Sequence, residues 1–177
     1  MKRRRTLLLL LLGVAILVPA GIAFADSRGS LDSSVPATAR FHDLDVAKAA
    51  GYSVTVEDLA KKTCIAQEGA GGMGVHMLNP DLLDENIDAE HPELLVYEPT
   101  DNGGMKLVAL EYLVFVAAWE GEHGAGAAPP SLFGQTFMLT PAGNRYGLPA
   151  FYALHSWIWK PNPSGLFQPY NPRVICP

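Results

Sequence analysis

Two histidines and two glutamates are the side chains of this sequence whose types and positions point most directly to chemistry. His76 follows a glycine-rich stretch, residues 71–74, whereas Glu111 and His155 each stand alone in an otherwise apolar run. Glu98 ends a further apolar run. Neutral imidazole and carboxylate groups are the ligands of mononuclear zinc, iron and manganese centres. If these side chains face one cavity, they form a candidate site for a divalent metal or a small polar ligand.

Simpler interpretations remain open for each of these residues. No two of them have the spacing of a ligand pair such as H-x-H or H-E-x-x-H, so the pattern has low specificity. A lone histidine in a strand is more often a hydrogen-bonded core residue than a ligand. Glu111 would be equally well explained by a buried ion pair, because an unpaired buried charge costs several kcal/mol. Met73 and Met77 flank His76 and add copper, bound by thioether and imidazole, to the alternatives.

Two apolar runs predict a hairpin that carries Glu98 and Glu111. Residues 94–98 and 106–116 are rich in β-branched and aromatic side chains, and the turn sequence Asp-Asn-Gly-Gly lies between them. Side chains alternate between the two faces of a strand, which places Glu111 among apolar side chains on one face of the second run. That run is apolar on both faces, as expected for a central strand.

A third run, residues 151–160, predicts the strand that carries His155. Alternation places His155 on one face with Trp157 and Trp159, and these tryptophans are therefore candidate walls of a ligand pocket. The three glycines before His76 permit a tight turn or a close approach of the backbone to another group. We expect this turn to aim the imidazole toward the strands.

Short helices complete the expected fold. Residues 40–50 have helical spacing of their apolar side chains and are followed by Gly51, and Asn79 with the next proline begins a helix of one or two turns. Residues 119–130 are rich in Gly, Ala and Pro and predict an irregular segment. The sequence therefore predicts a strand-dominated α+β domain with an antiparallel sheet or barrel-like core and one or two short helices.

The first 25 residues have the composition of a secretory signal peptide. A basic head, an apolar stretch and a small-x-small sequence at residues 23–25 follow one another. The apolar stretch is shorter than the roughly 20 residues of a transmembrane helix, although an uncleaved anchor is an alternative. Residues 26–38 are rich in Ser, Gly, Ala and Pro and predict a flexible leader, and residues 39–177 predict one globular domain. The expected location is the periplasm or the extracellular medium.

Charge and cysteine content agree with a secreted protein. The first 25 residues hold four of the 13 Lys and Arg residues and none of the 18 Asp and Glu residues, which leaves nine basic and 18 acidic side chains and a formal net charge of −9. This acidity disfavours nucleic acid, and a stable association with anionic membranes, as partners. Cys64 and Cys176 predict a disulfide bond in an oxidising compartment, with a pair of metal thiolates as the alternative.

Six segments carry a resemblance to a known family. They are residues 49–52 (AAGY), 71–76 (GGMGVH), 92–99 (PELLVYEP), 110–112 (LEY), 132–135 (LFGQ) and 154–165 (LHSWIWKPNPSG). Together they resemble a family of uncharacterised secreted bacterial proteins, over about residues 40–177. The resemblance implies secretion and brings no activity with it. A looser similarity to small secreted β-barrel-like domains is the reason for including a barrel among the expected folds.

Three functions are consistent with these patterns. The first is a secreted or periplasmic binding protein whose site, lined by His76, Glu111 and His155, holds a divalent metal or a small polar ligand. The second is a metal-dependent enzyme that uses the same residues, with Glu98 as the general base. The third is a non-catalytic structural or interaction protein in which the polar core residues satisfy one another. Convergence of the three side chains in space would favour the first two.

Overall fold

The computed structural model describes residues 30–177. The predicted signal peptide, residues 1–25, and the first part of the predicted leader lie outside the described residues. Within residues 30–177, no helix is long and apolar enough to cross a membrane.

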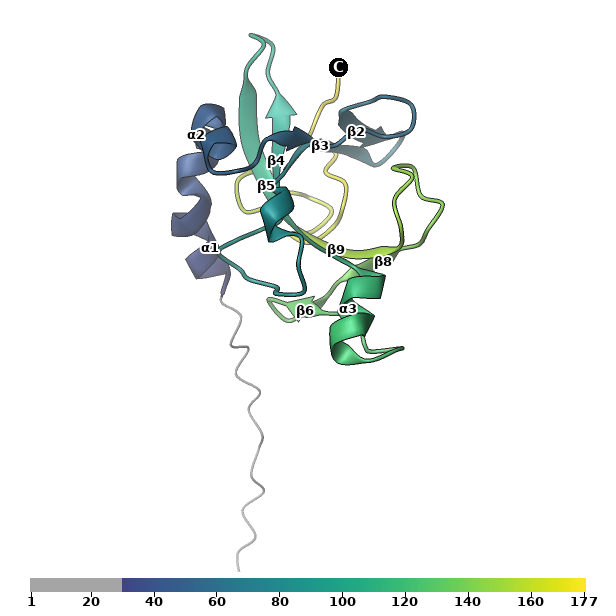
Figure 1. Ribbon diagram of the computed structural model, residues 1–177. Helices are drawn as coiled ribbons and strands as arrows, with labels where there is room; N and C mark the ends of the chain where they lie inside the picture. The colour runs from purple at the N-terminus through teal and green to yellow at the C-terminus, as the bar shows by residue number, and fades with distance from the viewer. Residues whose placement is uncertain (1–29) are drawn as a thin grey trace, which may run out of the picture.

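One antiparallel sheet forms the centre of the fold, in the order β1-β3-β4-β5-β9-β8, and β2 also pairs with β3 (Figure 1). Its strands are β1 (Val54–Thr55), β2 (Cys64–Gln67), β3 (Gly71–Leu78), β4 (Leu94–Pro99), β5 (Met105–Phe115), β8 (Met138–Thr140) and β9 (Phe151–Ser156). A separate two-stranded sheet contains β6 (Ser131–Leu132) and β7 (Gln135–Thr136). The strand-dominated α+β prediction is confirmed. The sheet is open, because β1 and β8 at its two ends do not pair with each other within the described residues, so the barrel alternative is wrong.

Side chains are buried on both faces of this sheet. One face packs against the N-terminal helices, α1 (Leu31–Thr38), η1 (Ala39–His42) and α2 (Leu44–Ala49), which stand beside the strands in Figure 1. Tyr97 on this face donates a hydrogen bond of 2.7 Å from its hydroxyl to the carbonyl of Phe41. The opposite face is covered by the C-terminal tail and by the loop before β9, through contacts of Val174 and Tyr146 with strand residues. The central strands are therefore apolar on both sides, as the sequence of β5 predicted.

A Tyr97→Phe substitution tests how strongly the N-terminal helices are attached to the sheet. It removes one buried hydrogen bond to the backbone of η1 without changing the packing of the ring. We expect the free energy of unfolding to fall by about 1–2 kcal/mol, as is typical for a lost buried hydrogen bond. Urea denaturation measures it, and an unchanged midpoint would contradict the assignment of this bond.

The helical content is higher than the sequence predicted. Residues 31–38 of the predicted flexible leader form α1, with Ser34 and Thr38 buried. The predicted helix over residues 40–50 is two elements, because the Asp43 carboxylate accepts hydrogen bonds from the backbone at residues 45 and 46 and starts α2 there. The predicted irregular segment begins as α3 (Val116–His123), with Trp119 buried. Only η2 (Pro80–Leu82) and its cap at Asn79 match the prediction closely.

The glycine-rich stretch belongs to strand β3, and the prediction of a tight turn is wrong. Gly71 and Gly74 have positive φ angles of 99° and 110°. A Cβ atom on Gly71 would clash with the backbone at Asn171, and one on Gly74 would clash with the carbonyl of Tyr97. Asn171 also forms a bridge with Gly72. The glycines are thus explained by the close approach of the C-terminal tail and of β4.

A disulfide bond between Cys64 and Cys176 fixes the end of this tail, as predicted. The two Cα atoms lie 5.5 Å apart, although 112 positions separate the cysteines in the sequence. Cys64 is on β2, which pairs with β3, so the bond holds the tail against the edge of the sheet. Disulfides of this kind are typical of oxidising, extracytoplasmic compartments.

Candidate metal centre

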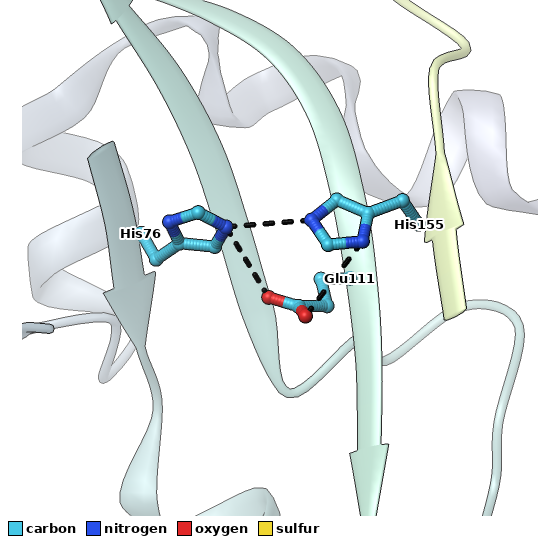
Figure 2. Close-up of side chains that lie close together, drawn as sticks. All are labelled: His76, Glu111 and His155. Atoms are coloured by element: carbon cyan, nitrogen blue, oxygen red, sulfur yellow. Dashed lines mark hydrogen bonds and ion pairs between the residues drawn. The ribbon is translucent and has the colours of Figure 1, made fainter. Parts of the chain in front are cut away.

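Three strands bring His76, Glu111 and His155 to one face of the sheet. Glu111 on β5 pairs directly with His155 on β9, so that both side chains share a face. His76 on β3 pairs with Val96 of β4, and Leu94, two residues before Val96, pairs with Glu111. All three side chains therefore lie on the face opposite the N-terminal helices. Figure 2 shows them pointing toward one another.

The ligand-type atoms of the three side chains lie within 4.8 Å of one another. His76 Nε2 is 3.4 Å from Glu111 Oε2 and 3.4 Å from His155 Nε2, and His155 Nδ1 is 3.7 Å from Glu111 Oε1. Good hydrogen bonds of these types are roughly 2.7–3.2 Å long, so none of the three contacts is a strong one. In a tetrahedral centre with metal–ligand bonds of about 2.0–2.2 Å, ligand atoms stand roughly 3.3–3.6 Å apart. The two separations of 3.4 Å from His76 Nε2 match that spacing. The third contact joins the other ring nitrogen of His155 to the other oxygen of Glu111, and therefore does not describe the same set of ligand atoms.

Burial controls the protonation of the cluster. The exposed fractions of His76, Glu111 and His155 are 3%, 7% and 2%. Burial raises the pKa of Glu111 to about 8. Burial also lowers the pKa of His76 to about 4, against a smaller opposing effect of the Gly74 backbone. The pKa of His155 falls to about 3, through burial and then the charge of His76. At neutral pH both imidazoles are thus neutral and able to bind a metal, whereas Glu111 holds a proton that a cation would displace.

One buried ring nitrogen of the cluster has no hydrogen-bond partner among the described residues. His76 Nδ1 is buried and has no partner of acceptable geometry. The His155 ring is supported on one side by Trp157, whose ring plane is inclined by 17° at a centroid distance of 6.2 Å. The Trp157 Nε1–H in turn donates to the carbonyl of Gln168 at 2.6 Å. The tail therefore holds His155 in place through Trp157.

Two cavities adjoin Glu111. The larger, about 140 Å³, is lined by His76, Glu111 and mostly aliphatic and aromatic side chains. The smaller, about 50 Å³, lies on the side of His155 and Met73. Tyr146 lines both. Its loop had no predicted role, because nothing in the sequence of residues 140–149 indicates which strand face it covers.

Glu98 is not part of this cluster, which corrects its predicted role. Its carboxylate oxygens accept hydrogen bonds of 2.7 and 2.6 Å from Lys160 Nζ. The Glu98 carboxylate also accepts a bond from the backbone N–H of Ile175. This half-buried ion pair ties β4 to the chain after β9 and gives Glu98 a structural explanation.

The two tryptophans do not line a ligand pocket beside the cluster, which is a second correction. Strand β9 ends at Ser156, and the alternation is not continued as far as Trp159, whereas the Trp157 ring still lies beside the His155 ring. Trp157 packs in the core with Val96 and Val174. Trp159 contacts His42, with ring centroids 4.5 Å apart, and packs against the core of the opposite face. Neither is among the residues that line the two cavities at Glu111.

Comparisons of this chain with protein-family models, with curated proteins and with solved structures find no match. The resemblance to uncharacterised secreted bacterial proteins therefore stays a prediction. What the chain does has to be argued from the geometry of His76, Glu111 and His155.

Proposed function

We propose that this chain is a secreted protein that binds one divalent metal ion through His76 Nε2, Glu111 and His155, with zinc as the expected ion. The observation that carries the proposal is the convergence of three buried side chains: one ligand atom from each lies within 4.8 Å of the other two, and His76 Nε2 is 3.4 Å from both Glu111 Oε2 and His155 Nε2. Two histidines with one carboxylate also form the ligand set of non-haem iron centres, and iron, manganese and copper are the other ions to test.

A purely structural role for the cluster fits the geometry less well. Buried polar groups that satisfy one another form hydrogen bonds, because an unmet buried donor or acceptor costs about 1–3 kcal/mol. Here His76 Nδ1 has no good partner, and its Nε2 lies 3.4 Å from two acceptor or donor atoms. A cation would replace these weak contacts by ligand bonds, and it would compensate the carboxylate charge that Glu111 acquires when the ion displaces its proton.

A binding role is preferred to an enzymatic one. The enzyme hypothesis relied on Glu98 as general base, and the pairing of Glu98 with Lys160 takes that residue out of reach of the cluster. Three protein ligands leave a fourth position for a small molecule. The proposed partner is therefore a small ligand. Nucleic acid and a stable membrane association are not proposed, because the net charge is acidic. The disulfide supports the periplasm or the extracellular medium as the location.

Elemental analysis of the purified full-length protein, prepared without a histidine tag, tests this proposal. We expect near-stoichiometric metal in the wild type and a loss of at least about tenfold in metal affinity in His76→Gln and in His155→Gln, since each removes one of three ligands. His91→Gln is the matched control, because His91 is exposed and pairs with Asp88 away from the cluster.

Two results of the metal analysis would contradict the proposed site. A folded wild type that takes up none of the four ions when dialysed against each would contradict it. Metal uptake that is unchanged in both cluster variants, but reduced in the His91→Gln control, would place the ion elsewhere.

A further inference from the structure

The 140 Å³ cavity is a mainly apolar chamber whose wall includes His76 and Glu111 of the cluster. Most other lining side chains are aliphatic or aromatic, among them Leu78, Leu94, Leu113, Phe115 and Phe151. A cavity of about 150 Å³ with similar Leu, Ile and Phe walls in another protein stays dry and binds benzene. The size and lining of this chamber therefore suit an apolar group of about six carbons.

The rim of the chamber is accessible to a ligand. Val56 and Leu83 are half-buried, and Leu148 is 36% exposed. The loop that carries Leu148 is held to the body of the protein, because Arg145 donates a hydrogen bond of 2.8 Å to Asp58. The side chains of Val56, Leu83 and Leu148 thus form the solvent-facing edge of the chamber, and the loop of Leu148 is fixed in place.

The charge of the bound ion favours an anionic group at the end of the ligand that reaches the cluster. A divalent ion bound to two neutral imidazoles and the Glu111 carboxylate has a net charge of +1 in a region largely shielded from water, where an anion would be bound strongly. Tyr146 lines both this chamber and the smaller cavity, and its hydroxyl donates a weak hydrogen bond of 3.7 Å to Met73 Sδ, which lines the smaller one.

We propose that the chamber binds a small monocarboxylic acid, with its carboxylate on the metal and its apolar tail of about six carbons between the leucine and phenylalanine side chains. This rests on the proposed metal function. The metal supplies the site for the anionic head, and the apolar walls select a tail without polar groups.

Isothermal titration of the zinc-loaded, full-length protein with benzoate tests the proposal. Acetate has the head without the tail, and benzyl alcohol has the tail without the head. We expect benzoate to bind at least about tenfold more tightly than either, since burying a ring adds hydrophobic free energy that acetate lacks. Benzoate is expected to bind metal-free protein much more weakly than zinc-loaded protein.

Two variants that fill the chamber show where the tail lies. Leu148→Trp and Leu83→Phe are expected to weaken benzoate binding by about tenfold, because they occupy the space of the ring, and to leave zinc content unchanged. Leu166→Trp is the matched control: Leu166 is 38% exposed and is not among the residues that line either cavity at Glu111.

The failures can be told apart because zinc content is measured on the same samples. Zinc-loaded protein that binds acetate and benzoate equally, or benzoate binding that neither filling variant weakens, overturns the ligand proposal and leaves the metal function standing. Protein that takes up no metal overturns both.

Discussion

Zinc is expected to raise the free energy of unfolding at pH 8 by about 4 kcal/mol when free zinc exceeds its dissociation constant by about 1,000-fold. The stabilisation should be smaller at pH 6. The reason is the proton on Glu111, whose pKa burial raises to about 8. Below pH 8 this proton competes with the ion, so apparent zinc affinity falls by up to tenfold per pH unit. The pKa values of His76 and His155, about 4 and 3, keep the imidazoles out of that competition.

The metal-free protein should have the opposite pH dependence. The pKa of Glu111 is about 8 in the folded state and near 4.5 in the unfolded state, so the folded state keeps a proton that the unfolded chain releases. This group's contribution to stability is therefore fully present below pH 4.5 and is lost as pH rises through 8. Bound zinc is expected to prevent this loss of stability, because the ion compensates the negative charge of the Glu111 carboxylate.

Two matched variants separate these effects in thermal unfolding curves with and without zinc. Glu111→Gln should remove part of the loss of stability that accompanies the rise in pH, and most of the stabilisation by zinc. Glu93→Gln is the control, because Glu93 is equally buried, has its pKa raised by burial to about 8, and lies outside the cluster. Glu93→Gln should make stability less dependent on pH and should leave the stabilisation by zinc unchanged. Equal zinc stabilisation of the wild type and Glu111→Gln would contradict the assignment of Glu111 as a ligand.

Removing the disulfide is expected to cause the largest loss of stability. Replacing Cys64 and Cys176 by serine opens a loop closed over 112 positions, which on the chain-entropy model lowers the free energy of unfolding by about 4–5 kcal/mol. The C-terminal tail should loosen first, because non-covalent contacts, among them the bridge between Gly72 and Asn171, then hold it in place of the disulfide. Tryptophan fluorescence during urea denaturation measures the loss, and Trp157, one of three tryptophans, packs against Val174 of the tail.

Reduction of the wild type provides the control for the serine variant. Wild type treated with dithiothreitol and the serine variant should unfold at the same urea concentration, well below that of the oxidised wild type. If all three have the same midpoint, the disulfide does not constrain the tail.

The strands of the hairpin could be predicted because their residue types have one clear preference. Residues 94–98 and 106–116 differ from β4 and β5 by a single residue at the ends. The alternation in β5 also identified Glu111 as an isolated acid on an apolar face. The pairing of Glu111 with His155 could not be predicted, because alternation fixes the face of a side chain within a strand but not which strands are neighbours.

Elements with weak local preferences were mispredicted for a common reason. The glycines of β3 suggested a turn because glycine usually marks one, whereas here the tail passes close enough to leave no space for side chains at Gly71 and Gly72. Helices α1 and α3 contain Ser, Pro or Gly, and contacts with the rest of the protein decide their conformation. Glu98 was misassigned because nothing in its own strand indicates Lys160, 62 positions away.

The three proposed ligands come from strands that are far apart in the chain, with 79 positions between His76 and His155. An unfolded polypeptide would hold these groups too widely dispersed to chelate an ion. The proposed metal site therefore forms only after β3, β4, β5 and β9 have paired, and the ion binds after the chain has folded. A bound ion would then act chiefly on the rate at which the folded sheet opens, and so would set how long the folded protein persists more than how fast it forms.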